Sequence, residues 1–167
     1  NLTPYLKDGK NVLAVEVYRF TDGSFLECQD FWRFSGIFRD VFLWSAPKTQ
    51  IRDFFFTTDL DKEFKNATVN LDVEVTGKKS NDEIQVKLMD LKGKEIAKQT
   101  TRAQIGTNHI EFEVMNPLKW TAETPNLYNL AISLIRKGKT TDIRNVKVGF
   151  RKIEFTSDGQ MLINGKT

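Results

Sequence analysis

The chain contains very few of the residues that build reactive or metal-binding sites. Its 167 residues include one cysteine, Cys28, and one histidine, His109. A single cysteine excludes an intrachain disulfide and a cysteine-based zinc site, and it is compatible with either a cytoplasmic or a periplasmic location. No serine or cysteine nucleophile motif accompanies His109, so nothing in the sequence indicates a catalytic triad.

Long apolar runs and an excess of one charge are also missing. No stretch of about 18 apolar residues occurs, so no membrane-spanning segment is predicted. The 25 Lys and Arg residues are interspersed with 22 Asp and Glu residues, for a net charge of +3. Because no basic stripe forms, we expect no nucleic-acid partner. The start, Asn1-Leu-Thr-Pro, shows no signal peptide, so any targeting signal would lie outside this sequence.

The chain does have enough apolar material for a folded domain. Hydrophobic residues make up 40% and charged residues 28% of it, as is typical of globular proteins. A chain of this length buries roughly 70% of its unfolded surface on folding. The length predicts one domain, or one domain with parts of its neighbours.

Alternation of apolar and polar residues predicts strands along most of the chain. In 68–75, Val69, Leu71, Val73 and Val75 alternate with polar residues, as expected for a strand with one buried face. Strands are predicted at 12–18, 37–44, 51–58, 68–75, 83–91, 95–101, 109–114, 128–136 and 140–148.

The spacing of these strands favours an all-β fold. Seven of them fall within about 100 residues and are separated by turn formers, which indicates an immunoglobulin-like β-sandwich. Pro47 and the polar residues after it interrupt the pattern, so a domain boundary is predicted there. The run Phe54-Phe-Phe56 must place alternate rings on opposite faces of its strand, which predicts at least one exposed ring or one contact with a neighbouring domain.

Four segments, in order, resemble the β-galactosidases of glycoside hydrolase family 2. They are Asp30-Phe-Trp-Arg-Phe-Ser-Gly-Ile-Phe-Arg-Asp-Val-Phe-Leu-Trp44, Asn116-Pro-Leu-Lys-Trp-Thr-Ala-Glu-Thr-Pro-Asn-Leu-Tyr128, Val148-Gly-Phe-Arg-Lys-Ile-Glu-Phe155 and Met161-Leu-Ile-Asn-Gly-Lys166. The resemblance implies three parts. Residues 1–46 would be the C-terminal part of a sugar-binding jelly roll, 47–150 the immunoglobulin-like sandwich, and 151–167 the start of a catalytic TIM barrel.

Asp30 is the site residue that the resemblance singles out. In such enzymes the aspartate before the aromatic-Trp-Arg sequence helps to bind a monovalent cation beside the galactose 6-hydroxyl. A carboxylate suits both tasks, because it binds hard cations and accepts hydrogen bonds from sugar hydroxyls. This role for Asp30 in substrate and metal binding is implied only for the whole enzyme. The alternative is a loop aspartate that caps its own backbone. No cofactor is implied for this chain, and Na⁺ and Mg²⁺ are implied for the whole enzyme.

Structural roles are expected for four further residues of the matching segments. Trp120 and Tyr128 would anchor the loop bracketed by Pro117 and Pro125. Arg151 would donate to a neighbouring domain. Gly36 would adopt a backbone conformation that other residues resist.

No catalytic residue is predicted in this chain. Retaining glycosidases need two carboxyl groups about 5–5.5 Å apart, and no candidate pair is evident among the carboxylates here. In the family, both catalytic glutamates lie downstream of Thr167. The chain alone is therefore expected to be an inactive scaffold fragment. Its expected partners are the rest of the same polypeptide, a β-galactoside substrate in the whole enzyme, and further copies of the same chain in a homo-oligomer. The alternatives are a free-standing carbohydrate-binding or adhesion sandwich, and part of a related β-glucuronidase or β-mannosidase.

Overall fold

The computed structural model describes residues 1–26, 34–78 and 81–167. These residues form two compact units, Asn1–Trp44 and Ser45–Thr167.

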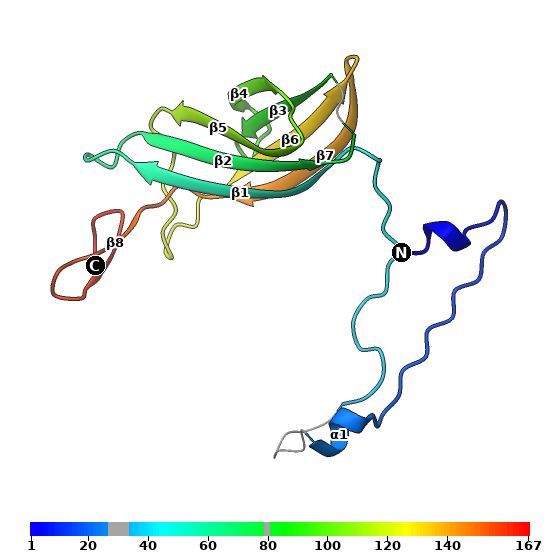
Figure 1. The fold of residues 1–167 in the computed structure, drawn as a ribbon. Helices are drawn as coiled ribbons and strands as arrows, with labels where there is room; N and C mark the ends of the chain where they lie inside the picture. Colours follow the sequence, from blue (N-terminus) through cyan, green and yellow to red (C-terminus); the bar gives the residue numbers. More distant parts are fainter. Residues whose placement is uncertain (27–33, 79–80) are drawn as a thin grey trace. The chain divides into compact units, whose positions relative to one another are not determined.

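The second unit is a two-layered antiparallel β-sandwich (Figure 1). One sheet has the strand order β1-β2-β5 and the other β4-β3-β6-β7, with a separate hairpin β8-β9 after them. This architecture confirms the predicted all-β sandwich. The strands are β1 (Gln50–Leu60), β2 (Ala67–Thr76), β3 (Asp82–Met89), β4 (Glu95–Arg102), β5 (Gly106–Val114), β6 (Tyr128–Arg136), β7 (Lys139–Val148), β8 (Ile153–Phe155) and β9 (Met161–Ile163).

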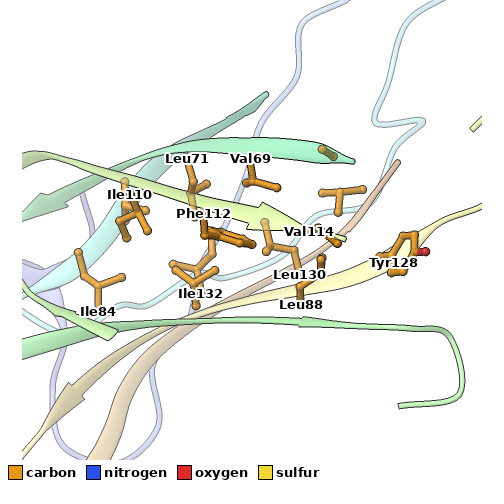
Figure 2. Close-up of a cluster of buried hydrophobic side chains, with 14 of the residues drawn as sticks. Val69, Leu71, Ile84, Leu88, Ile110, Phe112, Val114, Tyr128, Leu130 and Ile132 are labelled. Atoms are coloured by element: carbon orange, nitrogen blue, oxygen red, sulfur yellow. The ribbon is translucent and has the colours of Figure 1, made fainter. Parts of the chain in front are cut away.

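The alternation in the sequence forms the core between the two sheets. Val69, Leu71 and Val73 of β2 are fully buried, while the residues between them are partly or fully exposed. From the other sheet, Leu130 and Ile132 are equally buried and point into the same layer (Figure 2). Burying each such side chain contributes about 1.5–3 kcal/mol, so this layer supplies the main driving force for folding.

Aspartates and asparagines hold the turns between strands. The Asp61 carboxylate accepts hydrogen bonds from the backbone N–H groups of Lys65 and Asn66, at 2.7 and 2.9 Å. These bonds lower the pKa of Asp61. Asn108, which is buried, donates to the carbonyls of Val73, Gln104 and Gly106 and accepts from the N–H of Gln104. Local polar groups therefore satisfy backbone that the sheets leave unpaired.

An ion pair closes one open side of the sandwich, where the edge strands β1 and β7 come together. The Asp142 carboxylate accepts the N–H of Ile51 at 2.8 Å and binds Arg144 at 2.6 Å. Arg144 in turn donates to the Ile51 carbonyl at 2.7 Å. The N–H and the carbonyl of Ile51, which is fully buried, are thus both hydrogen-bonded to side chains of the opposite sheet.

The first unit corrects two predicted strands. Its described residues contain a short 3₁₀ helix, η1 (Thr3–Tyr5), and a short helix α1 (Asp22–Leu26), and neither 12–18 nor 37–44 forms a strand there. A strand needs a partner for its hydrogen-bonding ladder, and neither segment pairs with another one. Apolar side chains of both segments remain exposed, as Val12 at 86% and Phe42 at 79% illustrate.

The described residues contain two short helices, η1 and α1. Neither is long and apolar enough to span a bilayer.

Candidate functional site

Asp30, the predicted substrate and cation ligand, lies outside the described residues, as do Phe31, Trp32 and Arg33 of the same segment and Cys28 before it. Gly36, a few residues further on, has φ +103°, which confirms the predicted need for glycine there.

Within the second unit, the most specific polar geometry lies where the sandwich meets the β8–β9 hairpin. We call Trp120, Arg151, Lys152 and Asn164 the junction. The N–H of Trp120 donates to the Phe150 carbonyl at 2.8 Å, which joins the loop before β6 to the chain leaving β7. The Arg151 guanidinium lies 4.7 Å from the centroid of the Trp120 ring, a cation–π distance. The Thr58 hydroxyl donates to the Arg151 carbonyl at 3.2 Å, which adds a contact from β1.

Asn164 connects the hairpin to both of these segments. Its side-chain oxygen accepts the N–H of Lys152 at 2.9 Å, and its side-chain amide donates to the Trp120 carbonyl at 3.0 Å. The N–H of Asn164 also donates to the Lys152 carbonyl at 2.9 Å. One asparagine thereby fixes the far end of the hairpin to the sandwich. It has φ +52°, a conformation that asparagine tolerates better than most residues.

Lys152 adds charge to the same junction. Its ammonium lies 3.2 Å from the Asp59 carboxylate and 3.7 Å from that of Glu154. The bond to Asp59 is the main reason why the pKa of Lys152 is raised. Because these carboxylates are partly exposed, each pair contributes little by itself, but together they orient β8 against β1.

This raised pKa predicts a pH dependence. A lysine whose pKa is higher in the folded state stabilises that state below the unfolded pKa, and the contribution is lost as pH rises through the folded value. The melting temperature of Lys152→Met should therefore fall below that of the unchanged chain at neutral pH. The gap should close as pH rises past 10.5, the ordinary lysine pKa. A gap independent of pH up to strongly alkaline conditions would contradict this role of Lys152.

A glycine contact completes the attachment of the hairpin. A β-carbon on Gly165 would lie 2.7 Å from the ring of Phe64, and Gly165 has φ +74°. Phe64 itself lies in the β1–β2 loop and packs partly against the core. The two hairpins therefore approach at a distance that only glycine permits.

Gly165→Ala is expected to separate the β8–β9 hairpin from Phe64 because of this clash. Amide hydrogen exchange in Ile163–Lys166 should become faster, while exchange in β2 and β6 stays unchanged. Gly159→Ala is the matched control, since Gly159 also has positive φ (+85°) but no atom within 4 Å of the added carbon. Equal effects of the two substitutions would show that backbone strain, not the Phe64 contact, is responsible.

The loop before β6 is held by its two aromatic residues, as predicted. The Tyr128 hydroxyl accepts the N–H of Leu118 at 2.8 Å, and the ring meets Phe150 edge-on with centroids 5.1 Å apart. Trp120 packs so closely on Gly149 that a β-carbon there would lie 3.0 Å away. The loop is therefore a rigid part of the sandwich.

The aromatic run of β1 borders a groove beside the junction. Phe54 and Phe56 pack partly against the core, and Phe55 is 67% exposed, which confirms the predicted alternation. The groove has a volume of about 660 Å³ and includes Trp120, Val148 and Arg151 in its lining.

The possible metal ligands of the described residues are dispersed. No group of three His, Cys, Asp or Glu side chains among them could hold a metal ion. His109 pairs through Nδ1 with Asp72 Oδ1 at 2.5 Å, across β2 and β5, and the imidazole is 78% exposed. The contacts of the junction attach the β8–β9 hairpin to the sandwich. Sequence reasoning missed the contact of Asn164 in the junction and that of Phe64 beside it, because the turn pair Asn164-Gly165 indicates only where the hairpin ends.

Comparisons with known proteins agree with this architecture. The family model described as "Glycosyl hydrolases family 2" matches residues 49–151, and the one described as "Glycosyl hydrolases family 2, sugar binding domain" matches residues 1–47. The β-galactosidase of Priestia megaterium is 38% identical over 99% of this chain. That of Clostridium acetobutylicum is 41% identical over 92% of it. The chain spans only 17% of the length of either relative.

Solved structures show the same fold at lower identity. A glycosyl hydrolase family 2 member from Bacteroides cellulosilyticus superposes with a TM-score of 0.66 at 18% identity, covering 73% of this chain and 17% of that one. The β-glucuronidase of Parabacteroides merdae gives 0.63 at 19% identity, covering 72% and 16%. Since the family model for the sandwich alone matches more than half of the residues, the chain belongs to glycoside hydrolase family 2.

Proposed function

We propose that this chain is a non-catalytic part of a β-galactosidase, an enzyme that hydrolyses terminal β-galactosides. Its sandwich would hold a sugar-binding domain in register with a catalytic barrel that begins at the β8–β9 hairpin. The relatives that carry this proposal are named β-galactosidases and match nearly the whole chain. The domain limits proposed are 1–46, 47–150 and 151–167.

The observation that supports a positioning role is the junction. Asn164 binds both Lys152 and Trp120, and Arg151 covers the Trp120 ring, so the hairpin leaves the sandwich in one orientation. Orientation matters in such an enzyme because a displacement of about 1 Å can cost on the order of 10²-fold in rate. A rigid connection would transmit the position of the sandwich to the barrel.

Within the same proposal, Asp30 contributes to the active site of the whole enzyme. Its carboxylate would bind the substrate and a monovalent cation such as Na⁺, with Mg²⁺ as a further ion of the whole enzyme. In the longer protein, Asp30→Asn is expected to raise KM for a β-galactoside and to weaken the dependence of the rate on Na⁺. An unchanged Na⁺ dependence would remove Asp30 from the cation site.

The proposed activity is tested by comparing this chain with the longer polypeptide that would contain it. Both are assayed on chromogenic β-galactoside, β-glucuronide and β-mannoside. Turnover of the galactoside by the long form alone is expected. Preference for another sugar would favour a related glycosidase, and turnover by the short chain would overturn the non-catalytic role. A long form without activity that binds sugars would favour a carbohydrate-binding sandwich.

A further inference from the structure

The outer face of the β1-β2-β5 sheet is acidic. Alternating residues of these strands point away from the core, since their neighbours Val73, Ile110 and Phe112 are buried. We call this surface the acidic face; its carboxylates are Asp53, Asp59, Asp72, Glu74, Glu111 and Glu113. Arg52 and Lys152 offset two of these charges by pairing with Glu74 and Asp59, and His109 hydrogen-bonds to Asp72.

The outer face of the β4-β3-β6-β7 sheet has the opposite character. Lys87, Lys98, Arg102 and Lys147 occupy its outward positions, and we call it the basic face. Glu83 and Glu95 also lie on it, at its two ends. The two sheets are the two layers of one sandwich, so the acidic and basic faces point away from each other (Figure 1).

Each face places like charges directly opposite one another. Asp53 is the register partner of Glu74 on the acidic face, and Lys87 is that of Lys98 on the basic face. Such cross-strand pairs destabilise a sheet, typically by a few tenths of a kcal/mol to about 1 kcal/mol. Within the described part of the chain, no carboxylate forms an ion pair with Lys87 or Lys98. An opposing face of the other sign would turn this repulsion into attraction.

The two faces also differ in relief. Phe55 is 67% exposed and stands in the same cross-strand row as Asp72 and His109. In the basic face, the small residues Ala131 and Ser133 pair with Lys87 and Gln85. A protruding ring on one face and a row of small residues on the other permit close approach of two sheets, which stack about 10 Å apart.

We propose that the acidic face of one copy docks on the basic face of a second copy. The occupant is a second copy because this chain itself carries the complementary charges and the small-residue row. Three strands of about nine residues cover on the order of 400 Å² per copy, which is at the low end of interfaces, so the association is weak and sensitive to salt. Because the two docking surfaces differ, copies join head to tail.

The test is a charge swap followed by mixing, read as mass in sedimentation. One variant carries Glu111→Lys and Glu113→Lys, the other Lys87→Glu and Lys98→Glu. All four positions are on strand surfaces, and circular dichroism checks the fold of each variant. At about 0.01 M salt the unchanged chain is expected to associate with rising concentration, and each variant to remain a monomer. The mixture should form a one-to-one complex, because each variant keeps one unchanged face that complements the other.

Two further arms separate this contact from non-specific association. Glu123→Lys and Lys62→Glu make charge changes of the same sign, half as large, in exposed loops and should associate like the unchanged chain. Association should disappear at about 1 M salt, whereas clustering of the exposed apolar side chains of residues 1–44 would persist or strengthen. A monomeric unchanged chain at low salt, association that survives high salt, or variants that fail to combine would each overturn the proposal.

Discussion

Phe150→Ala is expected to lower the free energy of unfolding of the sandwich by about 3–5 kcal/mol. The ring is fully buried and meets Tyr128 edge-on, at 84° between the planes. Truncation removes the buried surface of the ring and its aromatic pair with Tyr128, and it leaves the backbone bond from Trp120 to the Phe150 carbonyl in place. Urea unfolding followed by circular dichroism measures the loss.

Phe155→Ala is the matched control for Phe150. That ring is 73% exposed in the short strand β8, so its loss should change stability by no more than about 0.5 kcal/mol. If Phe150→Ala were as mild as this control, the ring would not be part of the core.

Asp142→Ala is expected to destabilise the sandwich by about 2–3 kcal/mol. The substitution removes the acceptor of the Ile51 N–H and the partner of Arg144, in a place where the Asp142 side chain is only 9% exposed. Without this acceptor, the N–H of the fully buried Ile51 has neither water nor a protein partner. Burying such an unsatisfied donor is costly in free energy.

Asp142→Asn separates the two contributions at this position. The amide keeps an oxygen for the Ile51 N–H but loses the charge that binds Arg144, so a loss about half as large is expected. The measurement is again the midpoint of urea unfolding. The dependence of the unfolding free energy on urea concentration must stay unchanged, so that a shift in the midpoint reports a change in stability. Equal losses for Ala and Asn would assign the whole effect to the ion pair.

Strand positions in the sandwich were predictable because β2, β3, β5 and β6 each bury one face. The predicted strand 128–136 coincides with β6. The predicted strand 83–91 runs past the end of β3 at Met89, because the Asp90 carboxylate binds the N–H groups of Lys92 and Lys94 and starts the turn. The predicted strand 109–114 starts three residues after β5 does, since Asn108, a typical turn residue, is buried within the strand.

The predictions that the structure does not bear out, and the contacts that were not predicted, have a different physical origin. The strands predicted at 12–18 and 37–44 have the right alternation, but alternation indicates suitability for a sheet and does not supply a partner strand. Contacts between distant residues, such as Asn164 with Trp120 or Phe64 with Gly165, leave no local pattern. The role of Asp30 rests on resemblance alone and stays a prediction.

The most direct test of the positioning role is Asn164→Gly in the longer β-galactosidase that we propose contains this chain. Glycine tolerates the positive φ of this residue, so the substitution removes only the side-chain bonds to Lys152 and Trp120. We predict that kcat/KM for a β-galactoside falls by about 10- to 100-fold while the unfolding midpoint of the sandwich is unchanged. An enzyme with full activity and a hairpin that exchanges its amides rapidly would contradict the account.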